Sequence, residues 1–135
     1  MSSARTETGL SRYVPIVLSL LRLVAGLLFM EHGMQKLFGF PPTDHMPEML
    51  TLAWFAGVIE FVGGLLIALG LFTRAAALIC SGEMAFAYFM AHFPRAFFPA
   101  LNGGDAAILY CFFFFFLVFA GGGAIGLDAK LRHRR

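Results

Sequence analysis

The ionisable residues best suited to chemistry in this chain lie inside long hydrophobic segments. Glu60 lies within the segment 53–72, and His92 lies near the end of the segment 75–93. A charged side chain costs roughly 2.5–3.5 kcal/mol at the centre of a bilayer, so such residues tend to face a partner or a site. A carboxyl group and an imidazole can hydrogen-bond a substrate and exchange protons with it. Glu60 and His92 are therefore the candidate catalytic residues.

A second group of polar side chains shares one face of the segment 14–37. At ~100° of rotation per residue in a helix, Arg22, His32 and Lys36 fall within about a third of the circumference. Glu31 points the opposite way and is assigned to the membrane interface. Arg22, His32 and Lys36 are therefore candidate ligand-binding residues at the rim of an internal polar site.

Two pairings of these buried charges are expected. With a rise of ~1.5 Å per residue, Arg22 and Glu83 each lie about 12 Å from the cytoplasmic end of their segments. Their equal depth predicts an Arg22–Glu83 ion pair, which either supports function or only locks two helices together. Glu60 needs a different partner, and Lys36 or His32 can supply it.

Glycine spacing also bears on Glu60. Gly63 and Gly64 share its helix face, and small residues allow another backbone to approach closely. We therefore expect Glu60 to lie in a contact between helices and away from lipid.

The composition predicts an integral membrane protein. Of the 135 residues, 59% are hydrophobic and 13% are charged, the mean hydropathy is +0.79, and there are seventeen Phe. Soluble domains carry about twice that share of charge. Scattered basic residues argue against nucleic-acid binding. Neither the two Cys nor the His residues have metal-ligand spacing, so no metal site is predicted.

The hydrophobic segments predict an all-α membrane protein with a four-transmembrane-helix bundle. Each segment is close to the ~20 residues that cross a bilayer as a helix. The expected helices cover about 14–37, 53–72, 75–93 and 105–126. They lie in a transmembrane domain at 14–128, between a polar N-terminal tail at 1–13 and a basic C-terminal tail at 129–135.

The distribution of Lys and Arg predicts the orientation. The N-terminal tail, the turn at 73–74 and the C-terminal tail would share one side and hold seven of these residues. The opposite side holds Lys36 and Arg95. The positive-inside rule places both termini in the cytoplasm. The expected location is a bacterial cytoplasmic (inner) membrane.

Several stretches together resemble a known family. The ordered set is RLVAGLLFMEHGMQKLFGF, WFAGVIEFVGGLLIALGLFTRAAAL, AHFPRAFF, NGGDAAILY and GLDAKL. In this order and spacing the chain resembles the DoxX family of small four-helix membrane proteins over about residues 20–130. The resemblance implies emphasis on Arg22, His32, Gly33, Lys36, Glu60, Gly64, Gly70, His92, Asn102, Gly104 and Asp105. A Glu is more usual in the family where this chain has Asp105, and Glu31 and Glu83 lie outside the family pattern.

The resemblance implies a role linked to quinones, because some members resemble the membrane subunit of a quinone oxidoreductase. We then expect His32, Lys36 and His92 to hydrogen-bond a quinone head group, Asn102 and Asp105 to contribute to its binding, and Glu60 to exchange protons. No haem, flavin or iron–sulfur site is evident, so a larger redox protein would supply electrons. The alternatives are a non-enzymatic accessory subunit that anchors or stabilises a larger membrane complex and, less favoured, a small transporter.

Overall fold

A computed structural model of the chain describes residues 9–135, and this part contains helices and no strands. The all-α class predicted from the sequence is therefore confirmed. The first eight residues of the expected polar tail at 1–13 lie outside the described residues. The elements are a 3-10 turn η1 (Ser11–Tyr13), α1 (Val14–Phe38), α2 (Leu52–Leu69), α3 (Thr73–Ala87), a π-helical turn η2 (Tyr88–His92), α4 (Pro99–Asn102), α5 (Asp105–Ala120) and α6 (Leu127–Arg132).

The long helices are membrane-spanning in length and composition. Within residues 9–135, three stretches are long and apolar enough to cross a bilayer, namely Ser11–Phe38, Leu52–Leu69 and Thr73–His92. The apolar helix α5 is shorter, with 16 residues. It ends at Ala120 and not at 126 as the sequence predicted, because Gly121 has a φ of 74° and turns the chain out of the helix.

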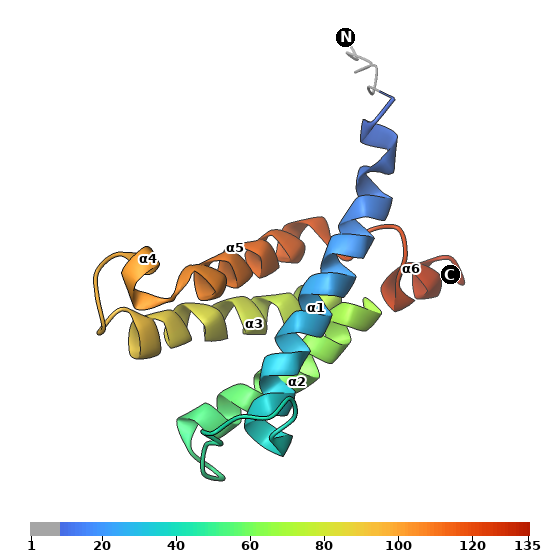
Figure 1. Ribbon diagram of the computed structural model, residues 1–135. Coiled ribbons are helices and arrows are strands. Elements are labelled where there is room, and N and C mark those ends of the chain that lie inside the picture. The colour runs from blue at the N-terminus through green and yellow to red at the C-terminus, as the bar shows by residue number, and fades with distance from the viewer. Residues whose placement is uncertain (1–8) are drawn as a thin grey trace.

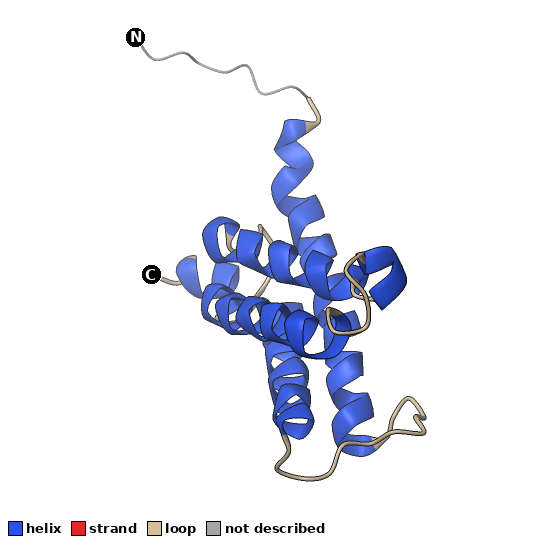
Figure 2. Cartoon of the chain, turned by 90° about the vertical axis from the view of Figure 1, so that its left-hand side faces the viewer, coloured by secondary structure: helices blue, strands red, loops and turns tan. Residues whose placement is uncertain are grey.

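Two helical hairpins make up the molecule. α1 packs along α2, α3 packs along α5, and α2 also contacts α3. The hairpins meet near the turn between α2 and α3, and their far ends point in different directions (Figure 1). Figure 2, turned by 90°, shows the same divergence, with α1 and α2 running along the vertical of the view and α3 and α5 running across them.

Glycines set the close approach of α1 and α2. A Cβ on Gly26 would lie 2.5 Å from the backbone nitrogen of Ala68, and one on Gly64 would lie 2.6 Å from that of Met30. A Cβ on Gly33 would meet the backbone of Phe61. Small residues at a seven-residue spacing thus bring two backbones into contact, which is the main packing device available to helices in lipid.

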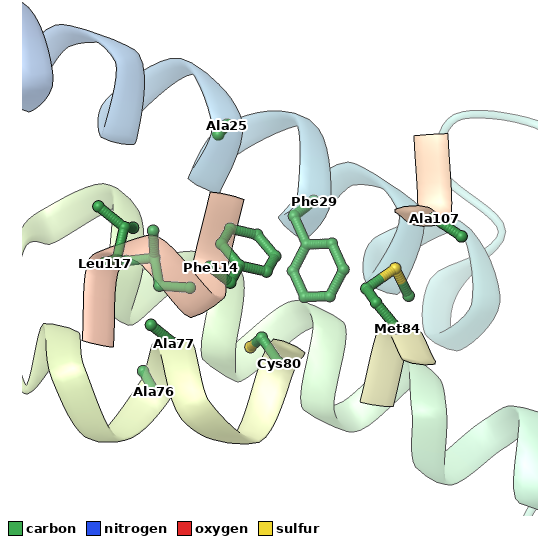
Figure 3. Packing of buried hydrophobic residues seen from close by; sticks show 10 residues of the cluster. Ala25, Phe29, Ala76, Ala77, Cys80, Met84, Ala107, Phe114 and Leu117 are labelled. Carbon is green, nitrogen blue, oxygen red and sulfur yellow. The ribbon is translucent and has the colours of Figure 1, made fainter. Parts of the chain in front are cut away.

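The hydrophobic core lies where the two hairpins meet. Phe29 of α1 packs its ring 4.9 Å from that of Phe114 in α5, and both side chains are buried. Ala77 and Cys80 of α3 and Leu117 of α5 complete the contact (Figure 3). The core therefore joins α1 to α3 and α5. We call the end of the molecule where α2 turns into α3 and where α5 ends the closed end of the hairpins.

The glycine contact predicts opposite effects for two Gly→Ala substitutions. Gly64→Ala should destabilise the protein by roughly 1–3 kcal/mol, because its methyl group must displace the α1 backbone. Gly82→Ala, on α3 with nothing within 4 Å of a new Cβ, should stabilise it by up to about 1 kcal/mol through helix propensity. Thermal unfolding in detergent measures both. Equal effects of the two changes would contradict the close α1–α2 contact.

Candidate functional site

The centre of the candidate site is an ion pair between α1 and α2. Lys36 Nζ lies 2.7 Å from Glu60 Oε1, which is one of the two pairings proposed from the sequence. The side chain of Glu60 is 3% exposed and that of Lys36 is 33% exposed. Glu60 is therefore the buried member of the pair, and Lys36 extends from it towards the surface.

A second carboxylate, that of Glu83 on α3, lies beside this pair. It interacts electrostatically with both Glu60 and Lys36. Neither oxygen of Glu83 has a hydrogen-bond partner among residues 9–135, and Oε2 of Glu60 has none either, although all three atoms are buried. Buried polar atoms without a partner are rare in proteins and call for an explanation, such as a bound ligand or a functional role.

An apolar slot opens next to these carboxylates. It has a volume of about 370 Å³ and lies where the hairpins diverge. Its two sides are the first half of α2 and the end of α3 with η2. Its polar lining consists of Lys36 and Glu83, and the remaining walls are formed by Leu52, Ala53, Phe55, Ala56, Ile59, Phe86, Ala87, Met90 and Ala91. Such a concave apolar surface with a few polar groups is typical of a small-molecule site.

His32 lies close to this group of charges. It lies within electrostatic range of Glu60, and its ring centroid lies 6.5 Å from that of Tyr110 on α5, in an edge-to-face arrangement. His32 and Lys36 therefore lie on the same side of α1, as helical phase predicts, and both act on Glu60.

His92 belongs to a different cluster. Its Nδ1 lies 3.1 Å from the backbone oxygen of Asn102. The side-chain amide of Asn102 donates to the hydroxyl of Tyr88 and to the carbonyl of Ala96, and its oxygen accepts from Gly104. In residues 9–135 no hydrogen bond or ion pair joins His92 to Glu60. The two expected catalytic residues thus have separate partners.

The His92 cluster organises the connection between η2 and α5. Asn102 is 1% exposed and bonds to both sides of this connection. Asp105 lies in the first turn of α5, and its side chain is exposed. The bonds of Asn102 therefore order this connection.

Arg22 holds the segment after α5, and the predicted Arg22–Glu83 ion pair does not form. Its Nη1 donates to the carbonyls of Gly122 and Ile125 at 2.7 and 2.8 Å. Its charge interacts with that of Asp128. The two side chains match in depth along the sequence, but Arg22, which is 4% exposed, lies at the closed end of the hairpins, where backbone carbonyls accept from its guanidinium.

Asp128 completes this arrangement, and sequence reasoning gave it no role. Its carboxylate accepts from the backbone nitrogens of Phe72 and Thr73, each at 2.9 Å, and so caps the start of α3. Its own backbone nitrogen donates to the carbonyl of Gly70. Partial burial raises the pKa of Asp128, but the two amide bonds and the charge of Arg132 outweigh it and leave the pKa below its ordinary value.

The sequence carried only a weak signal for Asp128. The stretch GLDAKL was part of the family resemblance, but the capped amides are 55 and 56 positions away along the chain. Local capping rules search for an acid next to the helix that it caps. Asp128 is distant from α3 in the sequence, so these rules do not identify it as the cap.

The fold and the buried charges define a helical integral membrane protein with a polar group inside an apolar interior. The chain belongs to the DoxX family, whose model matches residues 17–93. It is 44% identical to an uncharacterized protein of Haemophilus influenzae over 131 residues, which cover 91% of this chain and 96% of that protein. No solved structure matches the chain.

The contacts of Arg22 predict that exchanging the charges of Arg22 and Glu83 does not preserve stability. Arg22→Glu should destabilise the protein by roughly 2–4 kcal/mol, because it removes the donor from several buried carbonyls. Adding Glu83→Arg should not restore the loss, since Glu83 is not the partner. Thermal unfolding of the single and double variants in detergent measures the change in stability. Recovery of stability in the double variant would contradict this prediction and support an Arg22–Glu83 ion pair.

The cap formed by Asp128 predicts a dependence of stability on pH. A carboxyl group whose pKa is lower in the folded state stabilises the fold above its ordinary pKa of ~3.9, and this stabilisation disappears as the pH falls through the folded value. Asp128→Asn should therefore cost about 1 kcal/mol at neutral pH, and less as the pH falls through that range. Asp44→Asn, in the exposed loop after α1, is the control. A cost for Asp128→Asn that does not change with pH would contradict the cap.

Proposed function

We propose that this protein binds a lipid-soluble quinone in the slot between α2 and α3, as the membrane subunit of a quinone-linked redox system. The observation that carries the proposal is the pairing of an apolar slot with Lys36 and an unpartnered buried carboxylate in its lining. A quinone has an apolar body and two carbonyl oxygens. It therefore needs an apolar wall, a hydrogen-bond donor and a group that exchanges protons.

The residues present fit such a ligand. Lys36 offers an ammonium group that can donate to a quinone oxygen, and its ion pair with Glu60 keeps this group in place. Glu83 offers carboxyl oxygens that make no hydrogen bond within residues 9–135 and can hold a proton beside the slot. Glu60 Oε2 is a second such position. His32 adds a group that can balance the charge of Glu60.

A quinone supplies the redox chemistry, since it takes up two electrons and two protons to become a quinol. A partner redox protein would deliver the electrons. This chain's own part is to bind and orient the head group through Lys36, to exclude water with the apolar walls, and to hold protons on Glu83 and Glu60. His92 and Asn102 support the site only indirectly, by ordering the end of α3.

The proposal includes a location and an orientation. The chain would cross a bacterial cytoplasmic membrane four times, with α5 as the fourth crossing and both termini in the cytoplasm. Arg74 at the start of α3 and the Lys and Arg residues of the C-terminal tail support this orientation through the positive-inside rule. The relative in a bacterium supports the host class.

Quinone binding can be tested by filling the slot. Ala53→Phe places a ring in the slot, whereas Val62→Phe places one in a neighbouring apolar hollow on the same helix. Protein purified in mild detergent should retain quinone at a near-equal ratio. We expect Ala53→Phe to lose it, Lys36→Gln to bind a short-chain ubiquinone roughly tenfold more weakly, and Val62→Phe to bind as the parent does.

The same purification tests the accessory alternative. A stoichiometric larger partner without quinone, together with unchanged behaviour of Ala53→Phe and Lys36→Gln, would overturn the redox proposal in favour of a scaffold. The exposed Phe residues of α5, such as Phe112 and Phe119, would then be the packing surface for that partner.

A further inference from the structure

A groove lined with arginines lies at the closed end of the hairpins, away from the slot. It has a volume of about 620 Å³ and runs between the start of α3, the end of α5 and helix α6. Its basic residues are Arg74, Arg132, Arg134 and Arg135, and the one acidic side chain in its lining is Asp128. We call it the arginine groove.

Three of these arginines are available to a ligand. Arg74 already donates to the carbonyls of Val118 and Phe119 and so caps the C-terminal end of α5. The side chains of Arg132, Arg134 and Arg135, by contrast, donate no hydrogen bond within residues 9–135. Guanidinium groups bind phosphate oxygens with paired hydrogen bonds, which suits them to a phosphate ligand.

The acid in the groove does not cancel this charge. Asp128 already binds the amides of Phe72 and Thr73, and its pKa lies below the ordinary range, with partial burial opposing the amide bonds that lower it. Its charge also interacts with that of Arg132, but the lining holds four arginines against this single acid. The remaining lining carries a surplus of positive charge.

The position of the groove indicates which kind of phosphate compound it could bind. Thr73 begins a stretch that is long and apolar enough to span a membrane, so we expect the groove at the level of the lipid head groups. Phe72 and Leu131 line it with apolar side chains that are 66% and 51% exposed. Figure 1 shows α6 folded back beside the end of α2, where the backbone nitrogen of Asp128 donates to the carbonyl of Gly70.

We propose that the arginine groove binds the head group of an anionic phospholipid. Arg132, Arg134 and Arg135 would contact the phosphate, and Phe72 and Leu131 would lie against the start of the acyl chains. Basic pockets beside membrane helices on the cytoplasmic side have the chemistry for such lipids. The binding is independent of the quinone slot and needs no redox partner.

The test compares lipids and matched variants of the full chain. Protein in neutral detergent is mixed with phosphatidylglycerol or phosphatidylcholine, and retained lipid is counted by native mass spectrometry. The parent should retain phosphatidylglycerol preferentially. Arg132→Gln/Arg134→Gln/Arg135→Gln should retain it at least about tenfold more weakly, since each basic residue near the surface contributes to attraction.

The control removes the same charge elsewhere. Arg12→Gln/Arg95→Gln/Lys130→Gln takes away three cations outside the lining of the groove and should retain the lipid as the parent does. The triple Arg→Lys variant keeps the charge and should bind with intermediate strength. Its behaviour decides the outcome if the Gln variant does not fold.

Three results would overturn the proposal. The first is equal retention of the two lipids by the parent. The second is equal loss in the groove variant and the control, which would indicate unspecific attraction. The third is displacement of phosphatidylglycerol by inorganic phosphate at similar concentration, which would assign the groove to a soluble anion.

Discussion

The hydrogen bonds of Arg22 are the constraint on which the closed end of the molecule depends. Arg22 is 4% exposed, so its guanidinium needs acceptors, and these include the carbonyls of Gly122 and Ile125. These bonds draw the glycine-rich segment after α5 across α1 and α2. Asp128 thereby reaches the start of α3, where it caps two amides. One buried charge thus fixes the position of α6, the cap and the arginine groove.

At the far ends of the hairpins, the packing of the helices and not a buried arginine determines the structure. Glycines bring α1 and α2 into backbone contact, whereas α2 and α3 separate and leave an apolar slot. The ion pair of Lys36 and Glu60 joins α1 to α2 beside the slot, and Glu83 lines the slot from α3. Polar groups therefore collect where helix packing is incomplete, as a site for an amphipathic ligand requires.

The sequence predicted what depends on composition and helical period. The helical membrane class, the approximate segments and the side of α1 shared by His32 and Lys36 all follow from local patterns. The pairing of Lys36 with Glu60 was one of two open choices, since phase does not select a partner helix. The Arg22–Glu83 pair failed because depth along a segment ignores backbone acceptors. The role of Asp128 was out of reach because its partners are distant in the chain.

The divergence of the hairpins has a mechanical consequence. In residues 9–135 the side-chain hydrogen bonds that tie the α3–α5 hairpin to the rest of the chain gather at its closed end, through Asp128. Beyond the core around Phe29, the far ends are joined by none. The width of the slot therefore depends on the angle between the two hairpins, and the ring contact of Phe29 with Phe114 helps to hold that angle.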